Sequence, residues 1–221
     1  MTFSLLARCA ETGAFGAAVT TSGIAVGARV AFCAADVGGV LTQHRTDPRL
    51  GPRGLELLRS GCTAEETVAA LVGSTPHHRF RQLAVMDAIG ATAHFDGGLV
   101  KAERGAAHGR DVVAIGNILS SSTVPDAMAA AFLASEGELL AERLLRALEA
   151  GEAAGGEHGA VRSAHLLVVE REVFALVDLR IDWAPAPLPA LRALWEEYRP
   201  ELRDYVSRAL DPENAIPQVP R

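Results

Sequence analysis

Hydrophobic and polar positions near the start of the chain follow patterns typical of short β-strands. Residues 2–9 are mostly apolar and end at the turn sequence Glu11-Thr12-Gly13, and residues 16–21 are again mostly apolar. This pattern predicts a hairpin. Both faces of the two strands are apolar, which predicts a sheet covered on both sides. A further strand is predicted over residues 37–42.

Helical periodicity begins after residue 50 and later alternates with further strands. One short helix is predicted from Pro52 to Gly61, and a second begins at the capping box Thr63-Ala-Glu-Glu66 and ends at Gly73. The remaining predicted elements are strands over 82–88, 91–95 and 111–119, helices over 124–135 and 138–150, strands over 163–169 and 173–181, and a last helix ending near Leu210.

Clusters of antiparallel strands separated by pairs of helices indicate an α+β fold and not alternating βαβ units. Two sheets stacked face to face, each covered outside by helices, explain strands that are apolar on both faces. We expect a single domain over residues 1–210 and a proline-containing C-terminal tail over residues 211–221.

Composition narrows the possible partners. The 221 residues carry a formal net charge of −6 and a single lysine, Lys101, so nucleic acid and anionic membranes are not expected as partners. Three widely spaced cysteines favour a reducing compartment. No leader-like segment and no run of eighteen apolar residues occurs, so we expect a cytoplasmic protein.

Several standard catalytic and cofactor motifs are missing. The sequence has no Gly-x-Ser-x-Gly, Gly-x-Gly-x-x-Gly or His-Glu-x-x-His motif. His77 and His78 are adjacent and cannot share one helix face. We therefore expect neither a metal nor an organic cofactor.

Thr2 is the leading candidate for a nucleophile. Removal of the preceding Met leaves a threonine whose α-amine has a reference pKa of roughly 7.7–8.0 and can act as a general base beside its own hydroxyl. The hairpin predicts that Thr2 pairs near Ser22 and Gly23, where small hydroxyl residues cluster. The alternative is that these threonines simply favour strands.

The opening sequence Thr2-Phe3-Ser4-Leu5-Leu6-Ala7-Arg8, followed by Glu11-Thr12-Gly13, resembles the start of the DUF1028 family. Further similar segments follow in the same order through about residue 183: Phe15–Val19, Ala25-Val26-Gly27, Thr42-Gln43, Gly51–Leu58, Arg81-Gln82-Leu83, Gly116–Leu119 and Asp178–Asp182.

This family of uncharacterised bacterial and archaeal proteins is grouped with the Ntn hydrolases, in which the N-terminal residue is the nucleophile. The resemblance implies a four-layer αββα sandwich, a nucleophile at Thr2 and hydrolysis of an amide. The chain departs from the family pattern at Val161-Arg162-Ser163, where Arg-Gln-Ser is usual, and at Trp183, where a second acidic residue is usual. A substrate contact at either position would be altered.

The proposed chemistry needs neutral donors for a tetrahedral oxyanion. Asn117 and Gln43 end apolar strands and are the candidates, with a buried amide satisfied by the backbone as the equal alternative. Ser163 is a candidate to orient the Thr2 amine, although a turn role suits it as well.

Strand alternation places Asp178, Arg180 and Asp182 on one face. We assign Arg180, Asp178 and Ser22 to substrate binding, while a structural ion-pair ladder is the favoured alternative for the two charged residues. Lys101, in a polar neighbourhood, is expected to be exposed.

Two functions therefore remain. The first is an N-terminal-threonine amidohydrolase that acts on a small amide or peptide-like substrate. The second is a non-catalytic protein of the same fold that binds a ligand or partner, and a purely structural subunit is a weaker third. The helices rich in alanine and leucine favour a homodimer.

Overall fold

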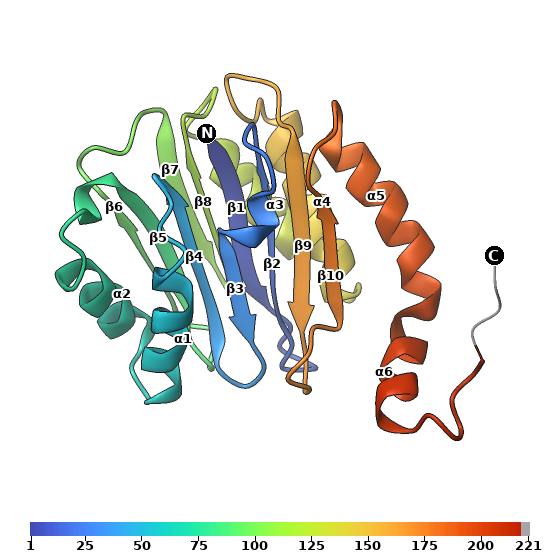
Figure 1. Cartoon of the computed structure of the whole chain (residues 1–221). Helices are drawn as coiled ribbons and strands as arrows, with labels where there is room; N and C mark the ends of the chain where they lie inside the picture. The colour runs from blue at the N-terminus through green and yellow to red at the C-terminus, as the bar shows by residue number, and fades with distance from the viewer. Residues whose placement is uncertain (218–221) are drawn as a thin grey trace.

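The computed structural model describes residues 1–217, which form two β-sheets and six α-helices (Figure 1). The strands are β1 (Thr2–Arg8), β2 (Phe15–Thr21), β3 (Ala31–Ala34), β4 (Gly38–His44), β5 (Arg81–Met86), β6 (Thr92–Asp96), β7 (Arg104–Gly109), β8 (Val112–Asn117), β9 (Ser163–Val169) and β10 (Val177–Ile181). The helices are α1 (Leu50–Arg59), α2 (Ala64–Gly73), α3 (Val124–Ala134), α4 (Leu140–Ala153), α5 (Pro187–Tyr198) and α6 (Leu202–Leu210), and a 3₁₀ turn, η1, spans Val26–Ala28.

The two sheets are antiparallel and stack face to face. One has six strands in the order β10-β9-β2-β1-β8-β7, and the other has four in the order β3-β4-β5-β6. Helices α3 and α4 pack on the outer face of the larger sheet, and α1 and α2 pack on the outer face of the smaller one (Figure 1). This is the α+β sandwich that the strand and helix pattern predicts.

Apolar side chains fill three layers because successive strand residues point to opposite faces. In β1, Phe3 and Leu5 pack against α3 and α4, whereas Leu6 faces the second sheet. The space between the sheets is closed by buried side chains from both, among them Leu41, Met86 and Ile115. Strands that are apolar on both faces are thus explained by helices on one side and a sheet on the other.

Several details differ from the sequence predictions. Strands β3 and β7 were not predicted: β3 has only four residues, and β7, Arg104–Gly109, lies at a sheet edge and consists of small and polar residues with no clear alternation. The predicted C-terminal helix is two helices, because a 3₁₀ turn containing Pro200 separates α5 from α6. The last predicted strand begins at Val177 instead of Val173.

The first hairpin is confirmed, with a small shift in register. Phe3 pairs with Thr20, which places Thr2 opposite Thr21 instead of Ser22 or Gly23. On its other side, Thr2 pairs with Asn117 of β8. The first residue of β1 therefore lies inside the six-stranded sheet, between two neighbours that carry polar side chains.

The segment after α6 is described as far as residue 217. Residues 211–217 follow α6 as turns, and the backbone carbonyl of Ile216 accepts a hydrogen bond from Arg208. Residues 218–221 of the predicted tail, including Pro220, lie outside the described residues. No described helix has both the length and the apolar character needed to cross a bilayer.

Candidate functional site

At one end of the sandwich the residues that face the space between the sheets change from apolar to polar. Along β1 the inward positions run from Leu6 to Ser4 and Thr2, and along β8 they run from Ile115 to Asn117. The facing strands β4 and β5 end in the same way, at Gln43 and Gln82, opposite each other. The ends of four strands therefore bring polar groups together here, where burial is costly unless each group is hydrogen-bonded.

Thr2 lies at this end and is 6% exposed. Its Oγ1 donates a hydrogen bond to the backbone carbonyl of Met1 and lies 3.2 Å from Oγ1 of Thr21. The Thr21 hydroxyl donates to the same carbonyl. The Thr2 hydroxyl thus has a fixed direction, and its partners are a carbonyl and a second hydroxyl.

A cavity of about 390 Å³ opens beside Thr2. It is lined by Met1, Thr2, Thr21, Ser22, Gly23, Val26, Arg29, Val30, His44 and Thr46. Its volume falls in the range of small-molecule sites. The predicted nucleophile Thr2 and the predicted substrate contact Ser22 therefore share one cavity.

The buried amides form one connected network next to Thr2. Gln82 is its centre: its Oε1 accepts from Gln43 at 2.6 Å and from Asn117 at 2.9 Å, and its Nε2 donates to Asp96 and to the carbonyl of Gly116, each at 2.8 Å. Both lone pairs and both hydrogens of the Gln82 amide are used.

The network continues into β1, because Ser4 Oγ donates to Oε1 of Gln43 at 2.7 Å. It therefore joins the first strand of one sheet to two strands of the other. The sequence prediction picked Gln43 and Asn117 but missed Gln82. The signal for Gln82 was present, since this amide stands at the start of a strand whose following residues are all apolar.

Asn117 has an unsatisfied acceptor. Its Nδ2 serves Gln82, but its Oδ1 is buried and has no hydrogen-bond partner. An unpaired buried acceptor is costly. Because Asn117 stands opposite Thr2 in the sheet, this oxygen marks a place where the site offers an acceptor and does not use it.

Ser163 lies close to this end but faces the cavity wall instead of Thr2. Its Oγ donates to the carbonyl of Gly23 at 2.6 Å and accepts from the backbone N–H of Val26 at 3.2 Å. The hydroxyl therefore holds the loop between β2 and β3, which is the turn role weighed for it. No hydrogen bond joins the side chains of Ser163 and Thr2.

Asp178 and Arg180 lie elsewhere, on the edge strand β10, and do not line the cavity. Asp178 accepts hydrogen bonds from Nε2 of buried His165 at 2.9 Å and from Arg180 at 2.8 Å. Burial raises the pKa of Asp178, but these hydrogen bonds outweigh it and bring the pKa to about 2. The pair forms the edge-strand ion pair that was the structural alternative.

Glu157, in the loop after α4, was not singled out in the sequence. It is 7% exposed, its Oε2 accepts from the backbone N–H of Ser22 at 3.2 Å, and its Oε1 has no partner. Burial raises its pKa to about 7, although the nearby α-amine of Met1 acts in the opposite direction. Burial also lowers the pKa of the Met1 α-amine. The charge of Glu157 raises this pKa in part, and the charge of Lys101 lowers it. Lys101 itself is exposed, as predicted.

Strained backbone surrounds the same end. Ala25, His44 and Ile118 have positive φ angles of 52°, 68° and 54°, a conformation that non-glycine residues rarely adopt. His44 lines the cavity, Ile118 follows Asn117 directly, and Ala25 belongs to the loop held by Ser163. Such strain gathers at functional sites in proteins.

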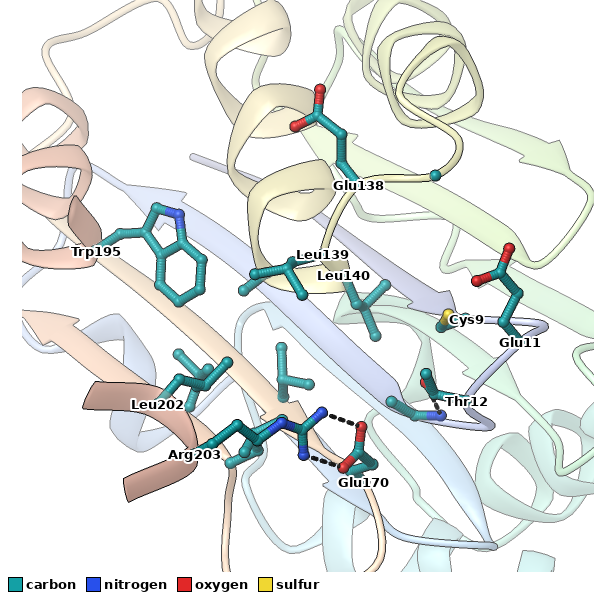
Figure 2. Close-up of a pocket in the computed structure, with 16 residues that line it drawn as sticks. Cys9, Glu11, Thr12, Glu138, Leu139, Leu140, Glu170, Trp195, Leu202 and Arg203 are labelled. Atoms are coloured by element: carbon teal, nitrogen blue, oxygen red, sulfur yellow. Dashed lines mark hydrogen bonds and ion pairs between the residues drawn. The ribbon is translucent and has the colours of Figure 1, made fainter. Parts of the chain in front are cut away.

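A second cavity of about 140 Å³ lies at the opposite end of β1 (Figure 2). Trp195, Leu139 and Leu140 line it from α5 and the start of α4, and Arg203 pairs with Glu170 at its edge. None of the residues predicted for the site lines this cavity. Among residues 1–217, no group of three or more His, Cys, Asp or Glu side chains is placed to hold a metal ion.

These features define a class: helix-covered sandwiches of two antiparallel sheets with a polar cavity at the start of the first strand. The chain belongs to DUF1028, a family of unknown function, whose model it matches over residues 2–191. The crystal structure of protein SPO2555 from Silicibacter pomeroyi, described with the same family model, has 34% sequence identity and a TM-score of 0.83, covering 89% of this chain and 88% of that one.

A second solved structure is much less similar. Anbu (ancestral beta-subunit) from Yersinia bercovieri has 11% identity and a TM-score of 0.42, over 99% of this chain and 100% of that one. No curated protein matches the sequence.

Replacing Gln82 with leucine is expected to destabilise the protein by about 3–5 kcal/mol, because it leaves buried donors of Gln43 and Asn117 unpaired. Asn214→Leu, an amide on the exposed C-terminal segment, is the control and should change stability by less than about 0.5 kcal/mol. Urea unfolding measures both. Equal stability of the two variants would show that the network contributes nothing.

Glu157→Gln is expected to stabilise the protein more at pH 8 than at pH 5. The raised pKa means that the native state keeps Glu157 protonated up to about pH 7, whereas the unfolded chain loses this proton near pH 4.5. Native stability therefore falls as the pH rises through this window, by roughly 2 kcal/mol, and the neutral glutamine removes that fall. Thermal unfolding of both proteins at the two pH values measures it; a difference independent of pH would contradict the assignment.

Proposed function

We propose that this protein is an N-terminal-nucleophile amidohydrolase that cleaves a small amide or peptide-like C–N bond with Thr2. The single observation that carries the proposal is the position of Thr2: the first residue of a central strand, buried, with its hydroxyl at the wall of a cavity. Membership of DUF1028 and the strained backbone around the cavity support it. The proposal places the enzyme in the cytoplasm and needs no cofactor.

Cleavage of the peptide bond before Thr2 by an aminopeptidase creates the catalytic group. The freed α-amine then stands on the same residue as the hydroxyl and takes its proton directly or through a water. The Thr21 hydroxyl, 3.2 Å from Oγ1, orients the nucleophile. Burial at this end of the sandwich favours the neutral amine, which is the form that acts as a base.

The reaction proceeds through an acyl-enzyme. Thr2 Oγ1 attacks the amide carbonyl while its proton passes to the α-amine, and the tetrahedral intermediate collapses as the C–N bond breaks. The α-amine of Thr2 gives this proton to the leaving nitrogen. A water then attacks the ester and gives a proton to the α-amine of Thr2. The α-amine passes this proton to Thr2 Oγ1 as the ester bond breaks, and the carboxylic acid leaves.

Asn117 is the proposed oxyanion donor. It pairs with Thr2 across β1 and β8, and one hydrogen of its Nδ2 remains after the bond to Gln82. Its unpaired Oδ1 is a ready acceptor for the freed α-amine. Gln43 contributes by fixing Gln82, and through it Asn117, so that the donor is oriented before the substrate arrives.

Two observations would test the nucleophile. The natively expressed protein should have an intact mass that begins at Thr2, and Thr2→Ala should lower hydrolysis across a panel of small amides by at least about 1,000-fold. Thr2→Ser should keep part of the activity, and Thr12→Ala, in the distant β1–β2 turn, should keep all of it.

A mass that retains Met1, or equal turnover by wild type and Thr2→Ala, would exclude this mechanism. Correct processing without turnover of any amide would instead favour the non-catalytic ligand-binding protein of the same fold.

The proposal includes a homodimer. Leu133 at the end of α3 and Leu139 before α4 are both more than 40% exposed, and the helices rich in alanine and leucine offer a surface for a second copy. Light scattering after size exclusion should give twice the mass of 23.2 kDa. A monomer at micromolar concentration would remove this part of the proposal and leave the chemistry untouched.

A further inference from the structure

The cavity beside Thr2 has a charge imbalance. Among its lining residues, Arg29 and His44 are the ionisable side chains, and no carboxylate takes part. Lys101 is close enough to affect the pKa of His44, and Glu157, which binds Ser22 beside the cavity, has a pKa raised to about 7 that favours its neutral form. A polar cavity whose lining carries a guanidinium and no carboxylate favours an anionic ligand.

Arg29 is held in place without being neutralised. Its two terminal nitrogens donate to the carbonyls of Ala25, at 3.0 Å, and Ile24, at 2.6 Å. It forms no ion pair with a carboxylate of the described residues. A guanidinium has five N–H donors in a rigid fork, so three hydrogens remain beyond the two used by its own loop.

The loop that carries Arg29 is itself fixed. Ser163 binds Gly23 and Val26 on the same loop, and Ala25 adopts the strained conformation described above. The position of the guanidinium is therefore set before a ligand arrives, which reduces the loss of conformational entropy on binding.

His44 supplies a second, different group. Its Nδ1 lies 2.8 Å from the carbonyl of Phe80, and a carbonyl can only accept, so Nδ1 carries the hydrogen. Burial lowers the pKa of His44, which favours the neutral ring. In that tautomer Nε2 is an acceptor, suited to an N–H or O–H of the same ligand.

We propose, resting on the function proposed above, that the substrate is an amide that bears a free carboxylate, which Arg29 binds. Members of this class are monoamides of dicarboxylic acids and N-acyl amino acids. The two-pronged guanidinium matches a carboxylate, and Thr2 lines the same cavity, where the amide of that ligand reaches it. Arg29 acts as a specificity-determining residue and takes no part in the proton transfers.

Binding without turnover tests the anion site by itself. Calorimetric titration with glutarate should detect binding to the wild type, and Arg29→Gln should weaken it by about 10- to 100-fold, the effect of one charge-assisted hydrogen-bonded pair. Arg29→Lys should recover part of the affinity. Arg53→Gln, at an exposed position of α1, is the matched control and should bind as the wild type does. Glutaramide, which lacks the charge, should bind weakly to all four proteins.

Kinetics separate this inference from the proposed function. With a monoamide of glutarate, Arg29→Gln should raise KM at least about 10-fold and change kcat little, while neutral amides should be poor substrates of both proteins. Equal affinity of glutarate for wild type and Arg29→Gln, or equal turnover of neutral and anionic amides, would overturn the inference. Glutarate binding that depends on Arg29, in a protein that hydrolyses no amide, would uphold the anion site and reject the hydrolase.

Discussion

The amide of Gln82 is the interaction on which the site end of the molecule depends. It stands between the two sheets and makes four hydrogen bonds, to Gln43, Asn117, Asp96 and the backbone of Gly116. Apolar contacts between sheets are tolerant of sliding, but a fully paired buried amide permits one arrangement only, because any shift leaves desolvated groups without partners. The network therefore fixes the relative position of the sheets where Asn117 meets Thr2.

The rest of the cavity follows from that fixed frame. Thr2 and Thr21 come from two paired strands, and the wall that carries Arg29 is a loop tied to β9 by Ser163. His44 also lines the cavity, at the end of a strand that the amide network holds. Groups that belong to distant parts of the sequence are thus positioned by rigid strands and by one loop that is tied to a strand, which suits a site that requires fixed distances.

Local pattern was enough to predict the layers, most of the strands and the place of Thr2 at the start of the first strand of the hairpin. It could not give Glu157, Arg29 or His44, because each acts through partners more than thirty residues away or through the shape of a cavity. Alternation correctly placed Asp178 and Arg180 on one face, yet it had no means to locate His165 beneath them. The edge strand β7 escaped notice since its small residues carry almost no periodic signal.

The place of β1 has a practical consequence for work with this protein. Its first residue lies within the six-stranded sheet at the mouth of the cavity, whereas residues 211–214, after α6, are exposed. Met1 already lines this cavity, so a longer peptide joined ahead of Thr2 starts from the cavity wall. An affinity tag at that end would act as a plug, so purification for biochemical assays should use a tag attached after the last helix.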